Sequence, residues 1–571
     1  MNNRGHVKHL LIAVAGSLLF CISASAQVVG IQADPVLLDA EFGPQDRENF
    51  QTPPKVFWPE TWFHFLGDNV SEAGINADLE AIRNAGISGI QWFHGNAGAR
   101  WPGVDKPVVP LSPEWDGMVA YLARTARDLD LRLTIQTCPG WAMAGGPWIQ
   151  PEDAMRDLVW SRTDVPAGSR ADLVLPKGMP SDEDWRDYRD VCVLAFPTPE
   201  GDTGEPLSLS NVRSDDLSWK ALLEGSGKVS ETEGGSHTVR FSLPEGAVVR
   251  TLELPSINSM NHPWVYVPGI HVRLDALQSD GSRRTVLDAD LAMSSWQDGA
   301  PLVLAVEETA ASEMELTLTN AHPLELAYLR FYSAARKNEW QAEAARTLRA
   351  KERFQAHVRQ SEKAYVPVEA VLDLSGQMDG SGRLQWTVPE GEGSWTVLRF
   401  GHVNSGRRNS PAPPEATGWE CNKFDVRGAD SQFSHYVGRL QDGPLAGLAG
   451  GMLMDSWECS NQTWTGLMED EFARRAGYAL RQWMPALTGY VMDSPETTYR
   501  FLTDWRRTVT ALYNENFFAR MTDLAHEKGL EVQYETAGGD VVAMDPLEYY
   551  KYADVPMCEF WQPLERTSSG A

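Results

Sequence analysis

The N-terminal part of the chain alternates short apolar runs with amphipathic segments. Residues 56–66, 89–94 and 131–136 form apolar runs of strand length. Residues 70–84 and 113–128 carry apolar side chains at helical spacing. Strands that alternate with helices in this way predict βαβ units around a parallel sheet.

The pattern changes between residues 166 and 389, which are rich in Gly, Ser and Pro. Short alternating or apolar stretches at residues 238–243, 302–306 and 314–319 predict antiparallel strands. We therefore predict a β-sandwich domain inserted at residues 166–390. Within it, charged side chains at i,i+4 spacing in residues 337–361 predict a solvated helical connector.

The alternation of strand and helix resumes at residue 394. Strands are predicted at residues 395–400 and around Met452, Val532 and Val555, with helices at residues 498–528 and 546–552. Together with the first three strands this gives seven, whereas a closed (β/α)8 barrel has eight. An open barrel leaves exposed strand edges, which natural sheets avoid. The prediction is an α/β fold with a (β/α)8 TIM-type barrel, built from residues 53–165 and 391–571 and truncated before its final strand.

Acidic residues follow several of these predicted strands. Asp455 and Glu458 end one apolar run, with Trp457 between them, and Glu535 and Glu559 end two others. The carboxyl ends of barrel strands are where such enzymes keep their catalytic groups. Carboxylates set among tryptophans at these positions suggest hydrolysis of glycosidic bonds, although any single acid could equally be a solvated loop residue.

The first 26 residues are typical of a cleaved signal peptide, because Arg4 and Lys8 precede an apolar run that ends in Ala24-Ser25-Ala26. This predicts export to the periplasm or the medium. No later stretch reaches the roughly 18 apolar residues of a membrane span. The net charge of −28 argues against nucleic acid or anionic membranes as partners. Five cysteines, which are widely scattered, remain after cleavage and form neither a disulfide framework nor a zinc pattern.

Several short motifs are distributed along nearly the whole chain, from about residue 53 to residue 562. They are Trp62-Phe-His-Phe65, Gly74-Ile-Asn-Ala-Asp-Leu-Glu-Ala81, Ala85-Gly-Ile-Ser-Gly-Ile-Gln91, Leu111-Ser-Pro-Glu-Trp115, Cys138-Pro-Gly-Trp141, Gly145-Gly-Pro-Trp148, Arg189-Asp190 with Leu194-Ala-Phe-Pro-Thr198, Pro411-Ala-Pro-Pro-Glu415 and Gly418-Trp-Glu-Cys-Asn-Lys-Phe-Asp425. With the acidic strand ends, they make the chain resemble glycoside hydrolase family 106, whose known members are α-L-rhamnosidases.

The resemblance implies a (β/α)8 barrel with β-sandwich domains and an inverting mechanism. It assigns the general acid to Glu458, with Asp455 as a neighbour whose charge would favour the protonated form of Glu458. It also implies that the general base lies on the last barrel strand, after the end of this sequence. A calcium ion that orients sugar hydroxyls is expected too, with Glu559 as the first candidate ligand and Glu535 or Asp455 as contributors. Glu559 could instead be paired with an arginine in the barrel mouth.

Sugar rings bind against aromatic faces, and their hydroxyls bind polar groups. We predict substrate binding by Trp92, His94, Trp141, Trp457 and Glu535, which lie at or near predicted strand ends. Trp148 is a further candidate platform. The alternative for each tryptophan is core packing, and a lone histidine is more often structural than a ligand.

Three functional hypotheses follow. The first is an exported α-L-rhamnosidase that acts on plant or bacterial polysaccharide. The second is an inactive carbohydrate-binding relative that lacks its general base. The third is a barrel glycosidase of another specificity, including a retaining enzyme with Glu535 or Glu559 as nucleophile, for which the two carboxyl groups would lie only about 5–5.5 Å apart.

Overall fold

A computed structural model describes residues 43–96, 106–179, 187–257, 269–278, 280–294, 297–309, 311–350, 357–535 and 544–558. The predicted signal peptide and Glu559 lie outside these residues. Among the described residues, no helix combines the length and the apolar character that a membrane crossing requires.

The centre of the α/β part is a parallel sheet of six strands. Their order is β1 (Glu60–Leu66), β2 (Gly89–Gly95), β3 (Arg132–Gln136), β24 (Gly451–Met454), β25 (Glu531–Glu535) and β26 (Val555–Met557). Sequence order and spatial order coincide, as in a singly wound βα array. The predicted parallel strands near residues 56, 89, 131, 452, 532 and 555 are therefore confirmed.

Helices connect these strands in chain order. They are α4 (Glu72–Asn84), α5 (Pro113–Asp128), α8 (Val426–Phe433), α9 (Arg439–Asp442), α10 (Met468–Ala476), α11 (Pro495–Leu512), α12 (Arg520–Glu527) and α13 (Pro546–Tyr549). Helix α3 (Pro44–Gln51) precedes the sheet. A π-helical turn, Tyr513–Ala519, joins α11 to α12, so that the predicted helix over residues 498–528 is confirmed as a nearly continuous rod.

Alternate residues of the parallel strands face the helices and form the main core. Ile90, Leu133, Met452 and Val532 belong to this core and are almost fully buried. The positions between them include Gln91, Thr134, Gln533 and Glu535. Since successive side chains of a strand point to opposite faces, the second face of the sheet is lined largely by polar groups.

The polar face is concave. Gln91 on β2 donates to Gln533 on β25 over 3.0 Å, although β3 and β24 lie between these two strands in the sheet. Adjacent strands are about 4.8 Å apart, so a flat sheet would separate β2 and β25 by roughly 14 Å. Arg132 on β3 likewise pairs with both Glu60 on β1 and Glu531 on β25. The sheet therefore curls like part of a barrel, while closure by eight strands stays a prediction.

The segment between β3 and β24 contains antiparallel sheets. One consists of β20 (Leu372–Asp373), β7 (Arg189–Pro197), β22 (Ser394–Asn404) and β5 (Arg156–Pro166), and beside it β6 (Arg170–Val174) pairs with β21 (Arg383–Thr387). A five-stranded sheet consists of β13 (Arg283–Asp290), β12 (Ile270–Leu277), β16 (Glu313–Asn320), β10 (Gly235–Ser242) and β8 (Ser210–Arg213). A three-stranded sheet of β15 (Leu302–Ala305), β11 (Thr251–Leu254) and β18 (Arg330–Tyr332) shares a separate hydrophobic core with it.

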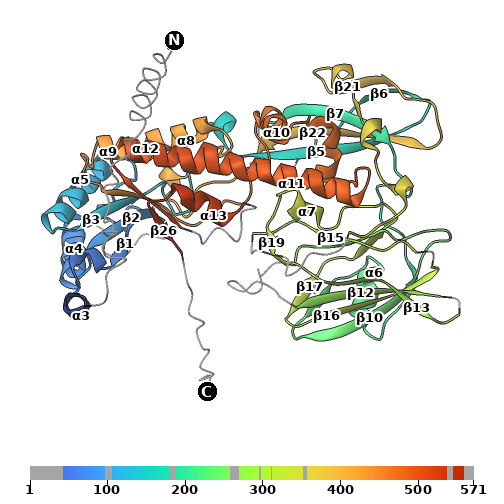
Figure 1. Cartoon of the computed structure of the whole chain (residues 1–571), viewed down its shortest axis with the longest axis horizontal. Coiled ribbons are helices and arrows are strands. Elements are labelled where there is room, and N and C mark those ends of the chain that lie inside the picture. The colour runs from blue at the N-terminus through green and yellow to red at the C-terminus, as the bar shows by residue number, and fades with distance from the viewer. Residues whose placement is uncertain are drawn as a thin grey trace, which may run out of the picture.

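Shorter elements complete this region. They are β4 (Gly145–Gly146) with β23 (Trp419–Glu420), β9 (Val229–Glu231) with β17 (Leu324–Leu326), β14 (Met293–Ser294) with β19 (Arg349–Ala350), and the helices α6 (Leu217–Leu223) and α7 (Trp340–Glu343). Figure 1 shows the parallel sheet with α4 and α5 at one end of the molecule and the antiparallel sheets at the other, with α11 reaching from one part toward the other.

Two predictions for this region are wrong. The apolar run at residues 395–400 lies in β22, which pairs antiparallel with β5 and β7 and is the third strand of its sheet rather than a barrel strand. A strand buried between two neighbours is continuously apolar in either kind of sheet, so that composition does not distinguish them.

The helical connector predicted at residues 337–361 is also absent from the described residues of that range, which form the four-residue α7 and the two-residue β19. Several of its charged residues, Lys337, Glu343 and Arg349, are buried and not solvated as the spacing suggested. Arg349 and Asp298 form an ion pair in which neither side chain is exposed. Glu343 and Arg359 instead pair with Arg506 and Glu496 on α11. The charged residues of this range therefore form ion pairs within the β domain and with α11.

Candidate active site

The polar face of the parallel sheet ends in a group of acids at the carboxyl edge. Asp455 follows β24, and Glu535 is the last residue of β25. The Ser456 hydroxyl lies 2.9 Å from Asp455 Oδ1 and 3.4 Å from Glu535 Oε2, so its single proton can be donated to either carboxylate. Both carboxylates are therefore bridged by one hydroxyl, and both belong to buried residues.

Glu458 lies three residues further along the loop and is half-buried. Its Oε2 accepts a hydrogen bond of 2.9 Å from Nε1 of Trp141. Trp141 lies in the loop after β3, so the contact joins the loops of two neighbouring strands. Of the substrate-binding residues predicted from sequence, Trp141 is thus placed beside the candidate acid.

The loop that carries Trp141 has a fixed backbone. Gly140 has φ of +82°, and a Cβ there would lie 2.7 Å from the backbone of Ser410, so only glycine fits without strain. The Gly140 amide donates to His94 O over 2.8 Å, and the Trp141 and Ala142 amides both donate to Ser410 O. These bonds fix the backbone that carries the Trp141 side chain.

A buried ion pair supports the same loop. Glu420 accepts hydrogen bonds from the amides of Met143 and Ala144, and its Oε2 lies 2.7 Å from Lys423 Nζ. Neither charged side chain is exposed. Lys423 Nζ also lies 5.3 Å from the centre of the Trp457 ring, a cation–π distance. The motifs at residues 138–148 and 418–425 thus pack on each other, and Lys423 joins them to Trp457 in the loop between Asp455 and Glu458.

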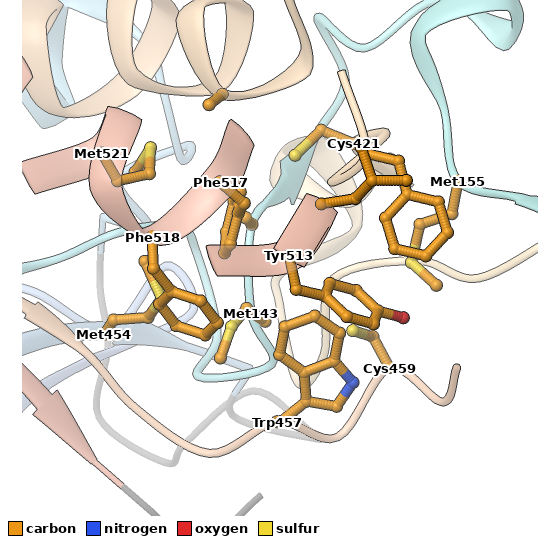
Figure 2. Close-up of a cluster of buried hydrophobic side chains, with 14 of the residues drawn as sticks. Met143, Met155, Cys421, Met454, Trp457, Cys459, Tyr513, Phe517, Phe518 and Met521 are labelled. Carbon is orange, nitrogen blue, oxygen red and sulfur yellow. The ribbon is translucent and has the colours of Figure 1, made fainter. Parts of the chain in front are cut away.

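Trp457 belongs to the core and not to the sugar-binding surface. It is almost fully buried, its ring lies 5.0 Å from that of Tyr513, and its Nε1 donates to Ser460 O. Figure 2 shows the indole among Tyr513, Cys459 and other apolar side chains. The predicted role of Trp457 as a platform is not compatible with this burial. Its side chain anchors the loop between Asp455 and Glu458.

Trp92 and His94 are likewise buried and point toward α5. Trp92 packs against Phe65 and Trp115, and the His94 ring lies 4.8 Å from Trp115. Burial lowers the pKa of His94 to about 3, so the ring is neutral at pH 7. The prediction that they bind substrate, which rested on their position near a strand end, does not agree with this burial. The neighbouring positions Gln91 and Phe93 are the ones that point to the polar face.

Two polar residues of the site were not predicted. Ser456 bridges the acids, and Gln136, at the end of β3, is almost fully buried with an Oε1 that has no hydrogen-bond partner. The signal that could have identified Gln136 is the alternation in residues 131–136, where Arg132, Thr134 and Gln136 are polar. Trp148, the further candidate platform, donates to Gln432 Oε1 over 2.9 Å and stacks on Tyr436.

Clustered carboxylates at the carboxyl edge of a curled parallel sheet are typical of α/β enzymes that use acid–base chemistry, glycoside hydrolases among them. The family model described as alpha-L-rhamnosidase, glycoside hydrolase family 106, matches residues 51–570. The chain therefore belongs to glycoside hydrolase family 106, which confirms the resemblance found in its motifs.

Two relatives illustrate the comparison. The chain is 27% identical over 546 residues to a protein of Formosa agariphila named "Putative beta-glucuronidase", a match that covers 95% of this chain and 34% of the relative. It also matches the solved structure of a rhamnosidase from Novosphingobium sp. PP1Y with a TM-score of 0.67 and 26% identity, over 90% of this chain and 49% of that one. The chain thus spans between a third and a half of the length of these relatives.

Proposed function

We propose that this glycoside hydrolase releases α-L-rhamnosyl residues from plant or bacterial polysaccharides or glycosides, after export directed by residues 1–26. The observation that carries the proposal is the hydrogen bond from Trp141 to Glu458 beside the Asp455 and Glu535 pair. It gives the family's candidate acid a fixed orientation at the edge of the sheet where the substrate would bind.

The proposed mechanism is inverting. Glu458 gives its proton to the glycosidic oxygen as the bond from the sugar carbon to that oxygen breaks, and a water molecule attacks the sugar carbon from the opposite face. With Oε2 held by the indole of Trp141, the proton would be carried on Oε1. A second carboxylate, about 6.5–9.5 Å from the acid, removes the proton of the water. We propose that this base lies on the barrel strand that follows β26.

Asp455 and Glu535 are proposed to bind the sugar hydroxyls together with a calcium ion. The described residues suit this ion, because Asp455, Glu535 and the unpartnered Gln136 Oε1 at the same sheet edge are all oxygen donors, the type that Ca²⁺ prefers. Glu559 remains a proposed ligand outside the described residues. The ion would hold the sugar hydroxyls in a fixed orientation.

Removal of calcium tests this assignment. We expect Ca²⁺ at a hundredfold excess over its Kd to stabilise the chain by about 2.7 kcal/mol in thermal or urea unfolding. Asp455→Asn should remove most of this gain, whereas Asp442→Asn, at an exposed carboxylate paired with Lys528, should keep it. Unchanged affinity for methyl α-L-rhamnoside in excess chelator would exclude the metal from the site.

A substrate panel tests the function itself. We expect kcat/KM on p-nitrophenyl α-L-rhamnoside to exceed that on p-nitrophenyl β-D-glucuronide by about 10² or more, because a pocket that pairs with particular hydroxyls rejects a sugar that cannot match them. The glucuronide is included because of the name of the Formosa relative. The reverse preference would replace the proposed specificity.

The panel is run on the chain of 571 residues and on a form extended to the natural stop codon. Turnover in the extended form alone would agree with a base on the later strand. Turnover in both would require two catalytic carboxylates before Ala571, with Glu535 and Glu559 as partners of Glu458. Binding without turnover in either form would identify an inactive carbohydrate-binding relative.

A further inference from the structure

Three side chains of the β domain bring metal-ligating atoms together. Asp216 directly precedes α6, Glu231 ends β9, and His237 lies on β10. One ligand atom from each residue lies within 4.8 Å of the other two, and His237 Nε2 lies 3.8 Å from Glu231 Oε1. Among the described residues, no other three His, Cys, Asp or Glu side chains bring their ligand atoms so close.

The spacing of the three atoms is close to that of a metal site. Three atoms that lie within 4.8 Å of one another surround a point no more than about 2.8 Å from each, whereas zinc–ligand bonds measure about 2.0–2.2 Å. Each ligand atom therefore has to move by less than about 1 Å to bind an ion at this point. Asp216 is exposed, so its side chain is free to make such a movement.

The imidazole nitrogen at this point is unsatisfied. His237 Nε2 is buried and has no hydrogen-bond partner among the described residues, and its 3.8 Å distance from Glu231 exceeds that of a hydrogen bond. Buried polar atoms in native proteins nearly always have a partner, so this atom requires an explanation. A metal ion shared with the two carboxylates would satisfy it, because neutral imidazole is the commonest metal ligand in proteins.

Trp219 orients two of the three side chains. Its Nε1 donates to Glu231 Oε1 over 2.9 Å, and its ring stacks on the His237 ring with the ring centres 4.7 Å apart. Trp219 itself is fully buried in the core of the β domain. Gly235 preserves the arrangement, because a Cβ there would lie 2.9 Å from His237 Nε2 and displace the imidazole. Metal ligands are typically held by outer partners in this way.

Asp216 offers an ionised carboxylate. Its Oδ1 accepts hydrogen bonds of 2.7 Å from the Ser218 hydroxyl and of 2.8 Å from the Ser218 amide. These two bonds lower the pKa of Asp216, and the nearby His237 adds to the effect. A carboxylate has acceptor positions on both oxygens, so that it can cap a helix with one and bind an ion with the other.

We propose that Asp216, Glu231 and His237 form a zinc site on the β domain, with a water molecule as the fourth ligand of a tetrahedral set. The imidazole selects zinc, because calcium and magnesium prefer oxygen ligands alone. The ion would fasten the loop before α6 to β9 and β10, two strands that α6 already contacts. Such a site is independent of the glycosidase activity proposed above.

NMR of the chain of 571 residues, labelled with ring-¹⁵N histidine, tests the site. We expect ZnCl₂ to shift the Nε2 resonance of His237, which is assigned by its loss in His237→Gln, with saturation at one equivalent. CaCl₂ at the same concentration should leave this resonance in place. A response to calcium alone, or to neither ion, would overturn the zinc site.

Two conservative variants identify the carboxylate ligands. Asp216→Asn keeps a good helix cap, and Glu231→Gln keeps an acceptor for Trp219, so both should unfold at the temperature of the parent when no metal is added. Each should weaken zinc binding in titration calorimetry by at least about tenfold to a hundredfold, the loss found for groups that only orient a ligand. Parent-like zinc affinity in both variants would refute the site.

The matched control is His271→Gln in the same domain. His271 also lies between two carboxylates, but Asp288 contacts one ring nitrogen over 2.9 Å and Asp290 the other over 2.8 Å. The two acids therefore cannot share one ion with a single nitrogen. His271→Gln should bind zinc with the affinity of the parent, and an equal loss in this variant would show that zinc binds to surface histidines without the proposed site.

Discussion

Glu458→Gln is expected to lower kcat/KM on natural rhamnosides by about 10²–10⁴ while activity on p-nitrophenyl α-L-rhamnoside falls by no more than about tenfold. The glutamine keeps the shape and can still accept the Trp141 hydrogen bond, but it has no proton to give. A sugar leaving group needs that proton, whereas nitrophenolate leaves without it. The two substrates measured side by side therefore separate proton donation from binding.

The control is Glu527→Gln, an exposed glutamate near the end of α12, which should match the parent on both substrates. An equal loss on the natural and the activated substrate in Glu458→Gln would contradict the role as general acid. It would indicate a group that binds or positions the sugar instead.

Trp141→Phe gives a graded version of the same experiment. It keeps an aromatic side chain in the loop and removes the N–H that holds Glu458 Oε2. Hydrogen bonds to charged groups contribute about 1.5–3 kcal/mol, so turnover of natural substrates should fall about tenfold or more. Trp148→Phe loses an equivalent bond, to Gln432 rather than to Glu458, and should leave turnover nearly unchanged.

The parallel strands could be predicted from the sequence because they are apolar on the helix side and most follow a segment of helical periodicity. It predicted the position of Asp455 and Glu535 for the same reason, since strand ends follow directly from strand bounds. The face on which a side chain lies was harder. A shift of one residue moves every side chain to the other face. The position of Trp92 and His94 near a strand end was therefore not enough to predict that they face the helices.

The hydrophobic periodicity of the sequence could not predict which residues join motifs that are far apart in the chain. Glu420 and Lys423 are 0% exposed, although charged residues are rarely buried without a partner. Their burial depends on amides of residues 143 and 144, more than two hundred residues away in the chain. The resemblance included these motifs but gave no reason for their pairing.

Lys423→Met should be among the most destabilising single changes in this domain, with a cost of about 3–5 kcal/mol in urea unfolding. Burial lowers the pKa of Lys423, but the Glu420 carboxylate 2.7 Å away outweighs burial and holds this pKa above its usual value. Lys423 is therefore protonated at pH 7. Removing the ammonium leaves the Glu420 carboxylate buried with two amide donors and no cation, and removes the contact with the Trp457 ring.

Two further variants test whether the loss of stability in Lys423→Met comes from the buried ion pair. Arg427→Met breaks an ion pair of similar length, 2.6 Å, but the Arg427 side chain is 72% exposed, so it should cost no more than about 1 kcal/mol. The double variant Glu420→Gln/Lys423→Met keeps an acceptor for the amides without a buried charge, and should recover part of the loss. If Lys423→Met costs no more than Arg427→Met, the ion pair does not hold the loops of Trp141 and Glu458 together, and their geometry must depend on the apolar packing of Trp457 instead.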